Sequence, residues 1–176
     1  NNNTITDILN KIEVKAGDVV MVKAGTIHAI GAGVFICEIQ QNSNCTYRMY
    51  DYDRRDKFGN PRELHVKKAL DVVDNHKYIK DNKTEVVIAR NEHFTEERLV
   101  QCKYFEVYKY DVNDEAKITV DEASFVSVLF INGSGTIETD DYEKTMEFKA
   151  GDSFFVSAGL RSIIIKGQAT MVVTRI

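Results

Sequence analysis

The sequence predicts an all-β protein of two similar units with one short helix between them. Two observations carry this prediction. Most apolar runs are short and rich in Val, Ile, Phe and Tyr, and one turn–strand–turn pattern occurs twice. A chain of 176 residues is long enough for one domain or for two small fused ones. A β-sandwich or β-barrel architecture follows from runs of this length.

The predicted strands are apolar runs bounded by Gly, Asn and Asp, residues that favour turns. They are Val19–Val22, Val34–Ile39, Phe105–Tyr110, Phe125–Ile131, Ser153–Val156, Ser162–Ile165 and Met171–Thr174. Residues 75–97 are polar and mixed, which is typical of a connector, and Glu85–Ala89 is a candidate strand within it.

One segment carries the signature of a helix start. Asn60 is a capping residue, Pro61 suits the first helical position, and Glu63 follows two residues later. Beyond them, Val66, Leu70 and Val73 recur at helical spacing on one face. We therefore expect a helix from about Pro61 to Asp74.

The repeated pattern is KAGDVVMVKAGTIHAI, beginning at Lys15, and KAGDSFFVSAGLRSII, beginning at Lys149. Both copies keep two glycines, which permit positive φ at tight turns. They differ where a side chain could do chemistry, since His28 of the first copy aligns with Ser162 of the second. This pattern predicts duplicated barrels, of which the first retains a candidate ligand and the second has lost it.

Composition excludes several classes of function. A net charge of −4 gives no electrostatic case for binding nucleic acid or an anionic membrane. No apolar run approaches the ~20 residues of a membrane span. The three cysteines show no CxxC spacing, which predicts free thiols and a cytoplasmic protein. Phosphate-binding and serine-nucleophile motifs of the usual spacing do not occur in the sequence.

Three residues are candidates for a site. His28 follows a turn glycine, and its spacing fits either a metal ligand or a histidine bonded to backbone. Glu38 ends an apolar run, where a carboxylate either lines a cavity or pairs with a base. Arg48 lies the same distance beyond Glu38 as Glu38 lies beyond His28. A structural salt bridge between Glu38 and Arg48 is the alternative to a shared site.

The segment from Gly17 to His28 resembles the second conserved motif of the cupin superfamily, whose histidine supplies a metal ligand. Lys23 stands near the position where a proline is common in that motif. Further residues resemble the type I mannose-6-phosphate isomerases in their shorter bacterial form. The similar stretches are AGTIHAI (24–30), EIQQNS (38–43), TYRMYDYDR (46–54), GNPRELH (59–65) and KALD (68–71).

This resemblance implies a double-stranded β-helix, or jelly-roll, fold and a specific chemistry. Family members interconvert mannose 6-phosphate and fructose 6-phosphate through an enediolate, using a zinc ion. The resemblance implies that His28 is a zinc ligand, that Arg48 stabilises negative charge on the substrate, and that Glu38 orients substrate or helps relay a proton. The other three zinc ligands of the family belong to an N-terminal segment. We therefore expect a C-terminal part of the enzyme, with zinc absent or weakly bound in this chain alone.

The resulting expectation has three parts: the C-terminal strands of an incomplete metal-bearing unit (1–60), a helix and connector (61–97), and a ligand-free second unit (98–176). An incomplete barrel exposes strand edges, so an N-terminal half or a second copy of the chain is an expected partner. The alternative function is a non-catalytic sugar-phosphate-binding or regulatory cupin protein.

Overall fold

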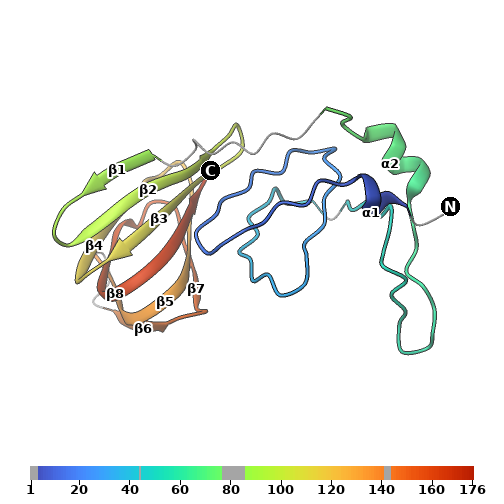
Figure 1. Ribbon diagram of the computed structural model, residues 1–176. Helices are drawn as coiled ribbons and strands as arrows, with labels where there is room; N and C mark the ends of the chain where they lie inside the picture. The colour runs from blue at the N-terminus through green and yellow to red at the C-terminus, as the bar shows by residue number, and fades with distance from the viewer. Residues whose placement is uncertain (1–3, 44, 77–85, 141–143) are drawn as a thin grey trace. The chain divides into compact units, whose positions relative to one another are not determined.

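The computed structural model describes residues 4–43, 45–76, 86–140 and 144–176 (Figure 1). The chain divides into two compact parts, Asn1–Lys80 and Asp81–Ile176, which we call unit 1 and unit 2. All strands of the described residues lie in unit 2, and two short helices lie in unit 1. No helix among the described residues is long and apolar enough to cross a membrane.

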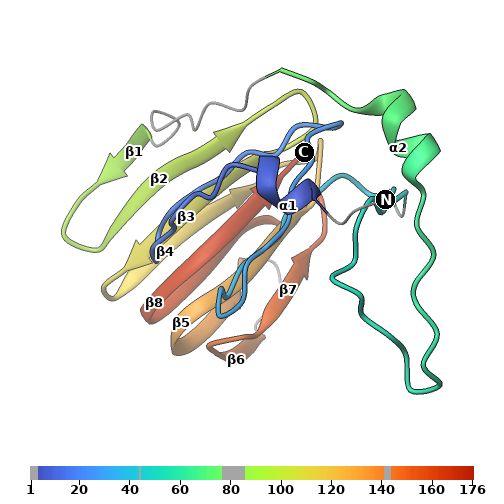
Figure 2. The same ribbon diagram turned by 45° about the vertical axis from the view of Figure 1, so that its right-hand side comes forward.

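Unit 2 is an eight-stranded antiparallel sheet with the order β1-β2-β3-β8-β5-β6 (Figure 2). Two further strands lie off this path, since β4 also pairs with β8 and β7 with β5. The strands are β1 (Val86–Arg90), β2 (Phe94–Gln101), β3 (Glu106–Val112), β4 (Glu115–Val120), β5 (Val126–Thr139), β6 (Thr145–Lys149), β7 (Ser153–Val156) and β8 (Arg161–Arg175).

The centre of this sheet is β8, which hydrogen-bonds to β3, β4 and β5. The sequence predicts two short strands here, Ser162–Ile165 and Met171–Thr174. The structure joins them, because β5 stays in register with β8 across Gly167 and its polar neighbours. Polar residues therefore interrupt the apolar pattern without interrupting the strand.

The other predicted strands of unit 2 are found, with small shifts. Ser153–Val156 is β7 as predicted, and Phe105–Tyr110 and Phe125–Ile131 fall largely on β3 and β5. The candidate strand Glu85–Ala89 corresponds to β1, with residue 85 outside the described residues. The predicted connector thus supplies β1 and the start of β2 to the sheet.

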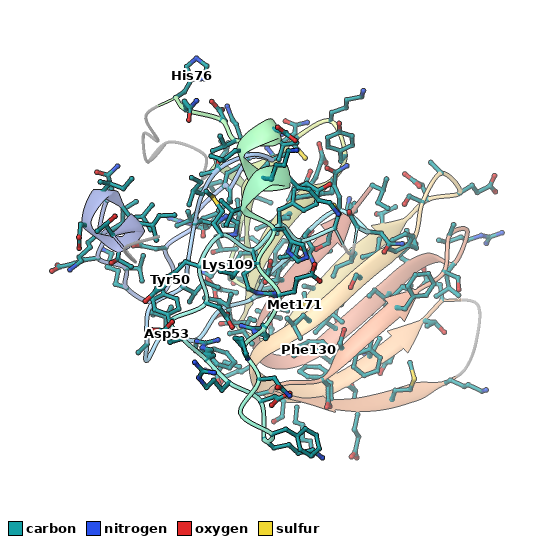
Figure 3. All side chains as sticks on the ribbon, turned by 90° about the vertical axis from the view of Figure 1, so that its right-hand side faces the viewer. Tyr50, Asp53, His76, Lys109, Phe130 and Met171 are labelled. Atoms are coloured by element: carbon teal, nitrogen blue, oxygen red, sulfur yellow. The ribbon has the colours of Figure 1, made fainter. Side chains whose placement is uncertain are left out.

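The apolar core is formed by side chains from the strands of unit 2. Which residues are buried follows from strand geometry. Along β4 every second residue is buried, because successive side chains point to opposite faces of a strand. Phe130 and Met171 are register partners on β5 and β8 and are fully buried (Figure 3). The Phe130 ring stacks on Phe148 with centroids 3.7 Å apart and planes 10° from parallel. Burial of these large side chains is the main stabilising term of the unit.

A pair of glycines lets β5 and β8 approach closely. Gly135 and Gly167 face each other in the register of these strands. A Cβ on Gly135 would lie 1.9 Å from the carbonyl oxygen of Lys166 and 2.9 Å from Cζ of Phe148. A Cβ on Gly167 would lie 2.5 Å from the carbonyl oxygen of Ser134. No side chain fits at either position without displacing backbone.

Two neighbouring turns of unit 2 are joined by a histidine–carboxylate pair. Nδ1 of His93 lies 2.9 Å from Oδ1 of Asp114, and the backbone N–H of Asn113 donates to the carbonyl of His93 at 2.7 Å. The hydrogen bond and charge of Asp114 raise the pKa of His93 above 6.5. The same contact lowers the pKa of Asp114 below 3.8.

We expect the His93 ring to titrate above pH 6.5 in the folded protein, and Asp114→Asn to bring its pKa down toward that ordinary value. Because the folded pKa of His93 is the higher one, its stabilisation is present below pH 6.5 for as long as Asp114 stays ionised, and it is lost as pH rises through the folded pKa. NMR titration of the ring protons measures both pKa values. An unchanged His93 pKa in Asp114→Asn would contradict the pairing.

Unit 1 contains α1 (Ile5–Ile8) and α2 (Val66–Val72) and has almost no apolar core. Among its described residues, only Asp51 and Ala69 are buried. Large apolar side chains lie in solvent instead, with Phe35 96% exposed and Phe58 77% exposed. A segment of this composition normally covers such surface with further protein.

Two predictions for unit 1 differ from the structure. The runs Val19–Val22 and Val34–Ile39 are not strands in it, because a strand needs a partner and none of the described residues of unit 1 forms a ladder with them. The helix is also shorter than predicted: it begins after His65 rather than at Pro61. Pro61 instead forms a β-bridge with Arg55. The duplicated barrels predicted from the repeat are likewise not seen in the described residues.

The repeated turn itself has the same geometry in both copies. Gly17 and Gly151 have φ values of +93° and +92°. In each copy the aspartate carboxylate that follows this glycine accepts from the backbone N–H of the lysine that opens the repeat, at 3.3 Å for Lys15 and 2.9 Å for Lys149. The two sequences therefore encode one local turn, whereas only the second copy continues into a paired strand among the described residues.

Candidate functional site

His28 stands just after the second turn of the first repeat. The N–H of Thr26 donates to the carbonyl of Lys23 at 3.1 Å, and the side chain of His28 then returns to the same turn. Its Nδ1 lies 2.8 Å from the carbonyl oxygen of Thr26. A carbonyl only accepts, so in the neutral ring Nδ1 carries the proton and Nε2 keeps its lone pair. The ring is exposed, and its Nε2 has the character of a ligand for a cation.

Helix α2 supports this turn from its C-terminal end. The N–H of Asp74 donates to the carbonyl of Gly25 at 2.9 Å. Gly25 has a φ of +84°, and a Cβ there would lie 2.7 Å from the carbonyl oxygen of Val72. Glycine is thus required twice over at this position, by its positive φ and by the close approach of α2. The position of His28 is tied to the helix through these contacts.

Arg48 is held at both its backbone and its side chain. His65 brackets the backbone: its N–H donates to the carbonyl of Arg48 at 2.7 Å, and its Nδ1 accepts from the N–H of Arg48 at 3.3 Å. The guanidinium donates through Nη1 to the carbonyl of Glu63 at 3.2 Å. Its Nε lies 3.7 Å from Oδ1 of Asp51. The side chain is about a quarter exposed, so the cation is fixed while still reaching solvent.

Asp51 is the only charged side chain that is buried among the described residues. Arg62 clamps it through both carboxylate oxygens: Nε donates to Oδ2 at 2.7 Å, and Nη2 contacts Oδ1. The hydrogen bond from Arg62, helped by the charges of Arg62, Arg48 and Arg54, holds the pKa of Asp51 below its usual value. The carboxylate is therefore charged at neutral pH and sits between two guanidinium groups.

A tight turn follows directly after Asp51. The N–H of Arg54 donates to the carbonyl of Asp51 at 3.0 Å, and the two residues between them, Tyr52 and Asp53, have φ values of +54° and +51°. Asp53 is labelled in Figure 3 together with Tyr50, whose ring lies 4.8 Å from that of Tyr52. Positive φ is costly for residues other than glycine. The turn reverses the chain and allows Arg62 to return to Asp51.

The structure shows no hydrogen bond or ion pair between any of the three predicted site residues, in the part of the chain that it describes. Glu38 is exposed, and no hydrogen bond or ion pair joins it to Arg48 or His28 among the described residues. In the same part of the chain, no group of three or more His, Cys, Asp or Glu side chains is placed to hold a metal ion. The metal and catalytic roles of these residues therefore stay predictions.

Sequence reasoning missed the residues that hold Arg48. Asp51 lies in a mixed-charge run, which is typical of a solvated loop, but it is buried because Arg62 and Arg48 compensate its charge. His65 falls within the range predicted as helix, but it precedes α2, and its Nδ1 accepts from the backbone N–H of Arg48. The clustering of acidic and basic residues around Asp51 was the available signal.

Comparisons with known proteins match both units of the chain. Residues 95–176 match the family description "Mannose-6-phosphate isomerase, cupin domain". YvyI of Bacillus subtilis, whose name assigns it provisionally to the mannose-6-phosphate isomerases, is 42% identical over 96% of this chain and 52% of its own length. ManA of Bacillus subtilis, named mannose-6-phosphate isomerase, is 33% identical over 97% of this chain and 52% of its own length.

A solved structure is similar as well. The crystal structure of the mannose 6-phosphate isomerase from Bacillus subtilis aligns with a TM-score of 0.67 and 40% identity, covering 77% of this chain and 42% of that one. The chain spans about half the length of the curated relatives it matches. The predicted all-β, cupin-like fold class is confirmed by these matches and by the antiparallel sheet of unit 2.

Proposed function

The chain belongs to the mannose-6-phosphate isomerase family, and we propose that it carries part of the active site of a zinc-assisted isomerase. The proposed reaction interconverts mannose 6-phosphate and fructose 6-phosphate. The observation that carries the proposal is sequence similarity to named isomerases along almost the whole chain. The local geometry of His28 and Arg48 adds independent support.

His28 suits the role of a zinc ligand. Zinc binds a neutral imidazole nitrogen, and the second ring nitrogen of a ligand histidine commonly donates to a backbone carbonyl. The contact between Nδ1 of His28 and the carbonyl of Thr26 has this form and leaves Nε2 to the metal. Since zinc sites use three or four protein ligands, His28 would be one member of a set completed by residues outside this chain.

Arg48 suits the stabilisation of an oxyanion. Aldose–ketose isomerisation moves a proton between C1 and C2 of the sugar, and negative charge develops on oxygen in the enediolate. Bound zinc would act as a Lewis acid that polarises the reacting oxygens. Arginine keeps its charge at any physiological pH, and Arg48 is already oriented by Glu63, Asp51 and His65. We propose that Glu38 orients the sugar or helps relay the proton.

We also propose that unit 1 is completed by further strands of an isomerase polypeptide. Its apolar side chains are widely exposed. Its Val19–Val22 run also follows the repeated turn, and the second copy of that turn precedes a paired strand, β7, in unit 2. An N-terminal half of the enzyme would supply such strands. A homodimer through the edge strand β1, where Val86, Val87 and Ile88 are exposed, is the alternative partner. The three free cysteines fit a cytoplasmic location.

The test compares turnover of mannose 6-phosphate by this chain with turnover by the reading frame that contains it, each with its metal content measured. We expect zinc and turnover to appear together when the upstream segment is present, and neither with this chain alone. Turnover by this chain with one zinc bound would overturn the idea of a shared site. Sugar-phosphate binding without turnover in the longer polypeptide would favour a regulatory protein.

His28→Ala in the active polypeptide is expected to remove most of the bound zinc and the isomerase activity together, because a three-ligand site binds the metal far more weakly. Metal content after dialysis is the direct measurement. His76→Ala is the matched control, since the His76 side chain is 95% exposed and lies outside the proposed site. Retention of a full equivalent of zinc in His28→Ala would exclude His28 as a ligand.

A further inference from the structure

The burial of Asp51 calls for a reason, because unit 1 buries almost nothing else among its described residues. A carboxylate loses favourable hydration when it is buried and must recover it from partners. Arg62 supplies hydrogen bonds to both of its oxygens. The Arg62 side chain is itself 47% exposed, so it could have paired with an acid in solvent at lower cost.

The pairing of Asp51 with Arg62 affects how Asp51 interacts with Arg48. Nε of Arg48 faces Oδ1 of Asp51 at 3.7 Å, beyond a normal hydrogen bond but well within ion-pair range. Nη1 is bonded to the carbonyl of Glu63. Among the described residues, no hydrogen-bond partner of Nη2 is found. The Nε and Nη1 edges of the guanidinium are thus held by protein groups, and the Nη2 edge is left to contact a ligand.

We propose that Asp51 is a positioning residue of the isomerase, which holds the Arg48 guanidinium in the orientation that stabilises the substrate oxyanion. This inference rests on the proposed function of Arg48. Arg62 saturates Asp51 and so keeps it from drawing Arg48 into a full ion pair. Asp51 aims Arg48 without neutralising it, and the backbone bracket from His65 completes the alignment. Asp51 itself does not touch the substrate.

The experiment uses the polypeptide that turns over mannose 6-phosphate. Asp51→Asn is expected to lower kcat about 10- to 100-fold, the scale of a misplaced catalytic group. KM should change less than about 3-fold, because a group acting only in the transition state leaves ground-state binding in place. Asp51→Glu, which restores the charge, is expected to recover part of kcat. Asp53→Asn is the matched control, being exposed and at a positive φ that asparagine tolerates.

A double-mutant cycle separates positioning from a structural role. If Asp51 acts through Arg48, the Asp51→Asn, Arg48→Met double variant is no slower than Arg48→Met alone. If the losses in kcat of the two single variants multiply in the double variant, with zinc content unchanged, the inference is overturned. Arg62→Met is the second variant if Asp51→Asn does not fold: its half-exposed side chain can be replaced without a cavity, and Arg48 is near enough to take over the pairing with Asp51. It should lower kcat by drawing Arg48 onto Asp51, and an unaltered kcat would contradict the inference.

The same measurements distinguish this inference from the proposed function. A full kcat in Arg48→Met would overturn both. An inactive Arg48→Met together with a fully active Asp51→Asn would overturn only the role of Asp51. Thermal unfolding of each variant shows whether loss of activity reflects loss of structure.

Discussion

Replacing Arg48 with methionine is expected to lower kcat of the active isomerase by about 10²- to 10³-fold, the usual cost of removing one donor from an oxyanion site. Methionine keeps much of the unbranched length of arginine but carries no charge and donates no hydrogen bond. The loss should appear in kcat and kcat/KM alike, because the proposed contact strengthens in the transition state. Initial rates over a range of mannose 6-phosphate concentrations measure it.

The matched control for Arg48 is Arg55→Met. Arg55 lies on the same stretch of chain and is exposed, and its Nη1 donates to the carbonyl of Gly59 within its own loop. We expect it to change kcat less than about 3-fold, as a surface substitution away from the site. Equal losses in both variants would indicate a general requirement for positive charge rather than a specific role of Arg48.

Gly135→Ala should destabilise unit 2 by about 3 kcal/mol or more, at the upper end of the cost of overpacking a core. The new Cβ would lie 1.9 Å from the backbone oxygen of Lys166, which cannot move without separating β5 from β8. It would also press on the Phe148 ring, which stacks on Phe130. Urea unfolding followed by far-ultraviolet circular dichroism measures the change in unfolding free energy.

Gly151→Ala tests the cost of positive φ by itself, without the steric clash found at Gly135. Its φ is +92°, but a Cβ there would meet no atom within 4 Å. The expected cost is about 1 to 2 kcal/mol, that of placing a side chain in a left-handed conformation. A loss for Gly135→Ala no larger than that for Gly151→Ala would show that β5 and β8 can separate to admit a side chain.

The sequence predicts strands well where both partners lie in the described residues. In unit 2 the apolar runs and their alternation agree with β3, β5 and β7, because each strand finds a neighbour to bury its inward face. Val19–Val22 has the same local pattern and the same turn before it, yet it is not a strand. Pairing is a property of two segments, so no single run encodes it. The helix does not begin at Pro61 as predicted, because tertiary contacts engage its first residues. Pro61 forms a β-bridge with Arg55, and Arg62 binds Asp51.

The sequence predicts candidates for the site but not the residues that surround them. The repeat singled out His28, and the family resemblance singled out Glu38 and Arg48, by residue type and order along the chain. The surroundings that orient Arg48 could not be found in this way, because His65 and Asp51 reach it across a loop whose path depends on the positive φ of Tyr52 and Asp53. Sequence spacing therefore indicates candidate side chains, and the folded path of the loop determines which residues hold them.

The order of the strands has a consequence for how unit 2 forms during synthesis. β8 is the last strand along the chain and the common neighbour of β3, β4 and β5. Until it leaves the ribosome, β3 can pair only with β2, and β5 only with β6 and β7, so both lack the neighbour that they share. Pairings that span so much sequence close slowly. We therefore expect the nascent unit to stay open to aggregation and to chaperones until β8 has emerged, and then to complete the sheet in a late step.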